Sequence, residues 1–207
     1  YESGQVKEEG IIFDDQKVGR WTEYFENGKR KNTGLYVKGS EHGKWYYWYK
    51  SGKKEKVGVY QNGKKDGTWK GWYFNGNKFF ERNYKNGEKE GSWIWWYNDN
   101  NLKYSGYYNG GIKNGKWIEY SDDKKIIIEG SYQDGNPFDG IFKGEYYFEG
   151  VKAEERIIYH SDGGTSGKIL AKGLMINENI KTGLWEYFNK DGSKKSSGIY
   201  NKNKKNG

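Results

Sequence analysis

Residues 43–69 read GKWYYWYKSGKKEKVGVYQNGKKDGTW, and this stretch spans one complete repeat of the chain. Trp45 and Trp69 are 24 residues apart, and each follows a glycine by two positions. Tyr60 lies nine residues before Trp69 and also follows a glycine by two positions. These two motifs, Gly-x-Trp and Gly-x-Tyr, recur in step elsewhere, which is the signature of a repeat architecture.

The first series keeps its spacing through five units and then becomes irregular. Its members are Trp21, Trp45, Trp69, Trp93 and Trp117, followed by Phe142 and Trp185. The second series consists of Ile12, Tyr36, Tyr60, Tyr84, Tyr108, Tyr132, Met175 and Tyr200. Most members of the second series have glycine two residues earlier, and Arg82 replaces that glycine once.

Each unit contains two strand-length runs, and a turn motif closes each run. These motifs are Asn27-Gly28, Asn62-Gly63, Asn75-Gly76, Asn86-Gly87 and Asp191-Gly192. Asn-Gly supplies the two positive-φ positions that a two-residue hairpin turn needs. The pattern therefore predicts an all-β chain with one β-hairpin per 24 residues, continued as an antiparallel meander, and no significant helix.

The spacing divides the chain into three parts of one array. Residues 1–142 hold the regular 24-residue repeats, and residues 173–207 hold the final repeats. Residues 143–172 interrupt the period and are interpreted as a lengthened hairpin followed by a loop near Gly163–Ser166. Such a break either carries a function of its own or marks a place where sequence drift is tolerated.

Composition agrees with a sheet rich in turns. Of the 207 residues 32 are glycine and 19% are aromatic, and aromatic residues favour strands whereas glycine favours turns. The absence of cysteine excludes disulfides and thiolate metal sites. The net charge of +8 permits an anionic partner, although a solvated lysine-rich surface explains it better.

Strand alternation sorts the aromatic residues into structural and functional candidates. The tryptophans of the repeats recur in every unit, so they are expected to form a stacked structural ladder: Trp21, Trp45, Trp69, Trp93, Trp117 and Trp185. The residues two and four positions later are more variable. They are the candidate partner-binding residues: Tyr47, Tyr49, Tyr73, Trp95, Tyr97 and Tyr187. The alternative is that these residues only fill bends of the sheet.

Motifs that support catalysis are lacking, so no enzyme activity, cofactor or metal site is predicted. His42 and His160 do not have metal-ligand spacing. Ser161 or Ser166 with His160 and Asp162 would need sequence neighbours to converge into a triad, and a solvated loop explains them better. Residues 163–168, GGTSGK, depart from the phosphate-loop pattern at both ends.

The motif runs, GKWYYWYKSGK and GVYQNGK among them, resemble the MORN repeat and especially its bacterial variant, found in antitoxins of the YwqK type. Choline-binding and glucan-binding repeats are similar, but they lack the residue between glycine and tryptophan. The MORN resemblance implies an elongated, twisted, single-layer antiparallel sheet of stacked hairpins. It also implies a scaffold, a dimerisation module or a binder of acidic phospholipid.

These observations predict a non-enzymatic repeat protein that mediates protein–protein interaction. The expected partner is another protein, a toxin in the antitoxin or immunity-like version, or a second copy paired through edge strands. The alternative is a binding module for cell-wall glycan or acidic phospholipid, and a specific nucleic-acid site is not favoured. Because the chain does not begin with Met, a cleaved signal peptide and either a bacterial cytoplasmic or an exported location remain open.

Overall fold

The computed structural model describes residues 1–159, 168–177 and 179–206, and these form β-structure throughout. The described residues contain eighteen strands and no helix. They form two compact units, Tyr1–Ile126 and Ile127–Gly207. The predicted all-β antiparallel meander of repeated hairpins is therefore confirmed.

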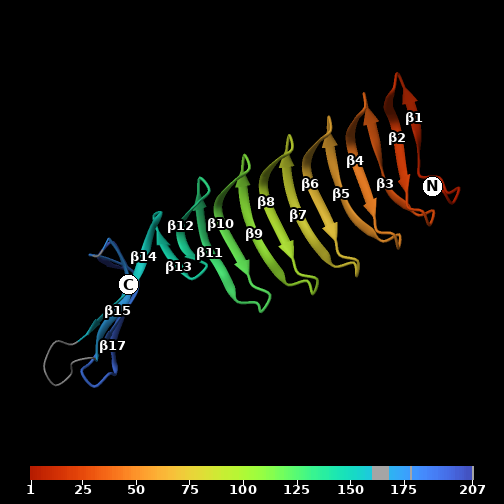
Figure 1. The fold of residues 1–207 in the computed structure, drawn as a ribbon. Coiled ribbons are helices and arrows are strands. Elements are labelled where there is room, and N and C mark those ends of the chain that lie inside the picture. The colour runs from red at the N-terminus through yellow and green to blue at the C-terminus, as the bar shows by residue number, and fades with distance from the viewer. Residues whose placement is uncertain (160–167, 178, 207) are drawn as a thin grey trace. The chain divides into compact units, whose positions relative to one another are not determined.

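The first unit is a succession of five hairpins in which each strand pairs antiparallel with the next (Figure 1). No second layer covers these strands in Figure 1, so both faces of this sheet are open. Its strands are β1(Glu8–Phe13), β2(Gln16–Tyr24), β3(Arg30–Val37), β4(Ser40–Trp48), β5(Lys54–Gln61), β6(Lys64–Trp72), β7(Lys78–Lys85), β8(Glu88–Trp96), β9(Leu102–Asn109) and β10(Ile112–Tyr120).

The second unit continues the hairpin pattern with more variable strand lengths. Its strands are β11(Ile126–Gln133), β12(Asn136–Phe142), β13(Glu145–Phe148), β14(Val151–Tyr159), β15(Ile169–Ile176), β16(Ile180–Phe188), β17(Lys194–Asn201) and β18(Lys204–Asn206). Each pairs antiparallel with its successor. The irregular segment 143–172 includes β13 and β14, which pair through Tyr146 and Ala153. The loop predicted near Gly163–Ser166 lies outside the described residues, and the three-part division stays a prediction.

At one end of the hairpins the turns have the predicted two-residue form. Asn62 and Gly63 have φ values of 52° and 76°, and Asn86 and Gly87 have φ values of 52° and 92°. Positive φ at both central residues is the requirement of a type I′ turn, which matches the strand twist. The Gly63 amide also donates to the Glu41 carbonyl oxygen of the preceding hairpin at 2.8 Å, so each turn is tied to its neighbour.

At the other end of the hairpins the prediction of two-residue turns is wrong. Gly28 has a φ of 78°, whereas Asn27 is not among the positive-φ residues, and the Gly28 amide donates to the Phe25 carbonyl. The Asn27 Oδ1 accepts a hydrogen bond from the Lys29 amide, which is the Asx-turn pattern. The same longer turn closes the hairpins at Asn75-Gly76 and Asp191-Gly192. Asn-Gly fits both turn types, so the dipeptide alone did not distinguish them.

The glycine of each Gly-x-Trp motif forms a β-bulge. Gly43 and Gly67 have φ values of 67° and 61°, a conformation that residues with a side chain adopt at a cost. Opposite the bulge at Gly43, the register between β3 and β4 shifts between Thr33 and Leu35. A bulge increases the local bend and re-aims the side chain that follows. In these motifs the re-aimed side chain is that of the tryptophan, two residues after the glycine.

The re-aimed indole lies flat on the backbone of the preceding strand. A Cβ atom added to Gly58 would come within 2.0 Å of Trp69 Cδ2, so the ring occupies the place of a side chain there. The Trp69 Nε1 donates to the Val59 carbonyl at 3.0 Å, and Trp69 is 1% exposed. The other ladder tryptophans donate in the same way to Ile11, Leu35, Asn83, Tyr107 and Leu174. The buried core of this single-layer sheet is therefore formed by indole rings that pack on the sheet's own backbone.

The ladder alternates tryptophan and tyrosine. Trp45 lies 6.0 Å from Tyr60, and Tyr60 lies 4.9 Å from Trp69, both with edge-to-face ring geometry. Edge-to-face pairs contribute about 0.5–1.5 kcal/mol each beyond burial of area. A structural role for the tryptophans thus follows from the geometry, but they pack against the tyrosines of the second series and not directly against one another.

Candidate interaction surface

The face of the sheet that carries the indoles, here called the tryptophan face, also carries a row of lysines. They occupy the position four residues before the tryptophan: Lys17, Lys65, Lys89, Lys113 and Lys181, with Glu41 in the second repeat. Lys17 Nζ lies 4.1 Å from the Trp21 ring centre, and Lys113 Nζ lies 4.3 Å from that of Trp117. These cations cover the aromatic rings, and each such contact contributes about 0.5–1 kcal/mol at an exposed site.

Two of the predicted partner-binding residues, Tyr47 and Tyr187, each place their hydroxyl group next to the hydroxyl group of another tyrosine. Tyr47 and Tyr60 have hydroxyl oxygens 3.3 Å apart, and the Tyr187 hydroxyl donates to that of Tyr200 at 3.0 Å. Burial and the bond to Tyr60 raise the pKa of Tyr47 above its ordinary range. Tyr47 also lies 6.2 Å from the Trp45 ring, which confirms that residues two positions apart share this face.

Three other predicted partner-binding residues, the tyrosines four positions after the tryptophan, connect successive repeats. Tyr49 donates to the Trp72 carbonyl at 2.7 Å, and Tyr73 donates to the Trp96 carbonyl at 2.9 Å. Tyr97 donates to the Tyr120 carbonyl at 2.8 Å. Each bond spans 23 residues and satisfies a carbonyl at the end of the next hairpin. The structure thus places these tyrosines at the hairpin ends, separate from Tyr47 and Tyr187, and their role in partner binding stays a prediction.

Trp95 lies in an aromatic cluster that the sequence did not predict. Its ring is 4.7 Å from Phe79 and 5.6 Å from Tyr104. The Arg82 guanidinium lies 4.1 Å from the Trp95 ring and 4.2 Å from the Phe80 ring. The two residues that depart from the repeat pattern, Arg82 and Trp95, are therefore in contact.

The surroundings of Arg82 are strongly basic. Arg82 Nε is buried without a hydrogen-bond partner in the described structure. Burial lowers the pKa of Lys65, and the nearby charges of Lys56 and Arg82 lower it further. Burial raises the pKa of Tyr104 to about 12, against a smaller opposing effect of Arg82. Among the described residues, no carboxylate lies within ion-pair distance of Lys65 or Arg82.

The opposite face of the sheet carries a row of exposed apolar side chains, here called the apolar row. In the first unit it comprises the exposed Ile11, Leu35 and Tyr107 and the half-buried Val59, the middle residues of the Gly-x-Tyr motifs and their counterpart in β1, whereas the polar Asn83 holds this position in β7. Ile11 is 62% exposed, Leu35 is 41% and Tyr107 is 47%. Leu35 pairs with Arg20 on β2 and with His42 on β4, so polar side chains lie between the apolar ones. The repeated apolar residue within GLY, GVY and GYY was the signal that could have identified this row.

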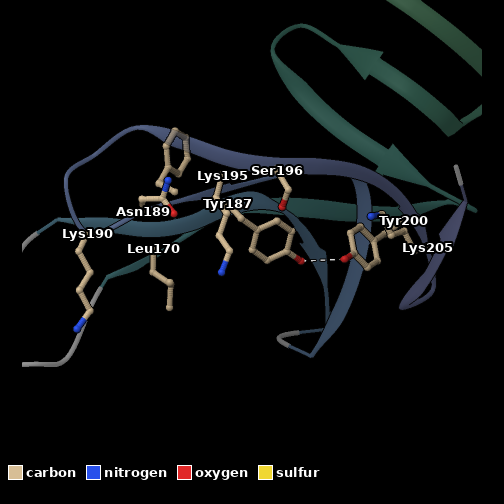
Figure 2. A pocket seen from close by; sticks show the side chains of 9 residues that line it. Leu170, Tyr187, Asn189, Lys190, Lys195, Ser196, Tyr200 and Lys205 are labelled. Carbon is tan, nitrogen blue, oxygen red and sulfur yellow. Dashed lines mark hydrogen bonds between the residues drawn. The ribbon is translucent and has the colours of Figure 1, made fainter.

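The second unit contains an open pocket of about 550 Å³ between β15, β16, β17 and β18. Figure 2 shows Tyr187 and Tyr200 pointing toward each other with their hydroxyls joined, and Leu170, Asn189, Ser196 and three lysines around them. The predicted binding residue Tyr187 therefore lines a cavity. Its surroundings are aromatic and polar, which suits a hydroxylated ligand better than an apolar one.

No cluster of three or more His, Asp or Glu side chains in the described part of the chain is close enough to hold a metal ion. The residues His160, Ser161, Asp162 and Ser166 lie outside the described residues. None of the described residues belongs to a helix long and apolar enough to cross a membrane.

The fold and its surfaces define a β-hairpin repeat protein whose two sheet faces carry different side chains. Comparison with protein families specifies the repeat: the family described as MORN repeat variant matches residues 17–38, 65–86, 89–109 and 113–134. The chain carries MORN-variant repeats, a class of repeat that binds proteins or membranes and is not itself catalytic. No curated protein matches the chain.

Proposed function

We propose that this chain is a non-enzymatic interaction module that binds another protein through the apolar row. The observation that carries the proposal is the repeated exposure of Ile11, Leu35 and Tyr107 at one repeat position on an open sheet face. Apolar side chains that recur on one exposed face favour an interaction surface, because single scattered ones are common on any protein.

The dimensions and composition of the row suit a protein partner. With neighbouring strands about 4.8 Å apart, the row from β1 to β9 extends about 40 Å. Polar side chains on the strands between the apolar residues interrupt it: Arg20 on β2, His42 and Lys44 on β4, and Asp66 on β6. Non-obligate protein–protein interfaces combine apolar contacts with hydrogen bonds in this way.

A photo-crosslinking experiment tests the proposal. A benzoylphenylalanine placed at Val59 is expected to capture one protein from the source cells. Leu35→Ser with Tyr107→Ser is expected to abolish that crosslink, whereas the control Arg20→Ser with Lys44→Ser, at polar positions of the same face, is expected to preserve it. If the crosslink persists in the Leu35→Ser, Tyr107→Ser variant, the proposal is contradicted.

The particular partner we propose is a toxin, on the basis of the resemblance to YwqK-type antitoxins. The protein captured at Val59 is then expected to arrest growth when it is expressed by itself. Co-expression of this chain is expected to restore growth, and the Leu35→Ser, Tyr107→Ser variant is expected not to. A captured protein without effect on growth would restrict the proposal to a general interaction module.

The alternative class, a glycan-binding module, is favoured by the pocket at Tyr187 and Tyr200. Stacking of sugar rings on tyrosine and hydrogen bonding to Asn189 and Ser196 would support it. Retention of the chain on peptidoglycan, lost in Tyr187→Ala and preserved in Leu35→Ser with Tyr107→Ser, would select this alternative. Binding to vesicles containing phosphatidylserine but to neither protein nor glycan would select the acidic-lipid version.

A further inference from the structure

We infer that the tryptophan face carries an anion-recognition site, centred on Arg82 and formed with Lys56, Lys65 and Lys89, which takes an acidic segment of a protein partner. The site lies on the face opposite the apolar row and does not depend on the function proposed above. Three observations support this inference. The site is positively charged, aromatic rings hold its cations in place, and these cations cover the aromatic rings.

Three of the four charges of the site are uncompensated. Lys56 pairs with the neighbouring carboxylate of Glu55, at 3.4 Å, whereas Lys65, Arg82 and Lys89 form no ion pair with any described residue. The same face near the N-terminus is neutralised, because Lys17 pairs with Glu8 at 2.8 Å. The lowered pKa of Lys65 has the proximity of Lys56 and Arg82 among its causes. Like charges held together without an anion are stabilised when an anion binds.

The cations are preorganised by the rings beneath them. Lys65 Nζ lies 4.8 Å from the Trp69 ring and 5.1 Å from the Tyr84 ring, and Lys89 Nζ lies 4.7 Å from the Tyr108 ring. Arg82 is held between Phe80 and Trp95. A guanidinium held on aromatic rings keeps the planar set of N–H donors that matches carboxylate geometry. Less conformational freedom is then lost when the anion binds.

The arrangement favours an acidic polypeptide over the other polyanions. Single-stranded nucleic acid needs open aromatic faces on which bases stack, whereas here lysines and Arg82 cover those rings. A membrane surface would be met by apolar side chains next to the cations, but the exposed Leu35 and Tyr107 lie on the opposite face. Lys65 on β6 and Lys89 on β8 are separated by two strand spacings, about 10 Å, which suits an extended chain of carboxylates better than one small anion.

The test uses the full chain and a labelled decaglutamate peptide, with decaglutamine as the uncharged control, followed by fluorescence anisotropy. Lys65→Gln with Lys89→Gln is expected to weaken decaglutamate binding about tenfold. Arg82→Gly, which restores the glycine of the other repeats, is expected to weaken it to a similar extent. The matched control Lys44→Gln with Lys116→Gln removes the same charge from the opposite face and is expected to change binding less than about twofold.

Several results would overturn the inference. Equal losses in the two lysine pairs would show that net charge alone attracts the peptide. Binding of oligo-dT or of phosphatidylserine vesicles, but not of decaglutamate, would assign the face to another class of partner. The Leu35→Ser, Tyr107→Ser variant is expected to retain decaglutamate affinity, so failure of the apolar-row proposal and failure of this one are distinguishable. Tryptophan fluorescence confirms that each variant is folded.

Discussion

Trp69 occupies the space where a side chain at Gly58 would be, with only 2.0 Å between its Cδ2 atom and an added Cβ. The same relationship joins Gly34 to Trp45, Gly106 to Trp117 and Gly173 to Trp185. The glycine and the tryptophan are thus a single packing unit shared by two adjacent strands. This pair explains why the two motifs of the repeat keep a fixed separation.

Gly58→Ala is expected to destabilise the protein by about 2–3 kcal/mol, because the indole of Trp69 must leave its place on the backbone. In a Trp69→Leu background the same substitution is expected to cost much less, since no ring then occupies the space. Urea unfolding of the four variants of this cycle measures the coupling. Equal costs of Gly58→Ala in both backgrounds would contradict the packing relationship.

Tyr49→Phe is expected to cost about 0.5–1.5 kcal/mol, because it removes the hydrogen bond from its hydroxyl to the Trp72 carbonyl. The chain also offers the reciprocal experiment. Phe25 occupies the same repeat position without a hydroxyl, so Phe25→Tyr is expected to gain stability by a similar or smaller amount. Urea unfolding midpoints measure both changes. A loss of stability in Phe25→Tyr would contradict the idea that a tyrosine hydroxyl at this repeat position generally connects successive repeats.

Stability is expected to fall as the pH rises from 10 toward 12. Burial raises the pKa of Tyr104 from 10.0 to about 12, so the folded state retains its proton where the unfolded state has lost it. This contribution is fully present below pH 10 and is lost as the pH passes the folded-state pKa. Urea unfolding across this range measures the slope. Tyr104→Phe is expected to flatten it, and an unchanged slope in that variant would show that other groups cause it.

Arg82→Gly is expected to raise the pKa of Lys65 toward its ordinary value. Burial is the larger cause of the lowered pKa and remains, but the repulsion from Arg82 is removed. NMR titration of the lysine side-chain carbons measures the change, with Lys65→Gln to assign the signal. Lys56→Gln is expected to shift the pKa in the same direction. If neither substitution changed the pKa of Lys65, the positive charges of Arg82 and Lys56 would not act on Lys65, and this prediction would be wrong.

The strands and the repeat could be predicted from sequence because the information is local and recurs. Gly-x-Trp, Gly-x-Tyr and the turn dipeptides each specify backbone conformation within a few residues. The turn at Asn27-Gly28 was predicted incorrectly because Asn-Gly also fits the longer turn, in which only the glycine has positive φ. Its closure depends on the Asn27 side chain and on the amide of Lys29, which the dipeptide does not reveal.

The residue contacts on the two sheet faces were harder to predict than the strands, because they depend on contacts between neighbouring strands and repeats. The bond from Tyr49 to Trp72 spans 23 residues, and no local pattern indicates it. Arg82 and Trp95 were each recognisable as departures from the repeat, but their contact depends on the pairing of β7 with β8, which places Phe80 opposite Trp95. The apolar row was overlooked because its residues differ in type, although Leu35, Val59 and Tyr107 share one position.

The bonds from each tyrosine to the carbonyl 23 residues later have a consequence for how such a chain can change in length. The repeats that carry Tyr49, Tyr73 and Tyr97 present the same donor to the repeat that follows each of them. Removal of residues 49–72, one period, would bring Trp48 next to Tyr73, which then occupies the place of Tyr49 with its own bond to Trp96 intact. Among the repeats that carry this tyrosine, the chain can therefore gain or lose a whole hairpin without a new kind of contact between neighbours.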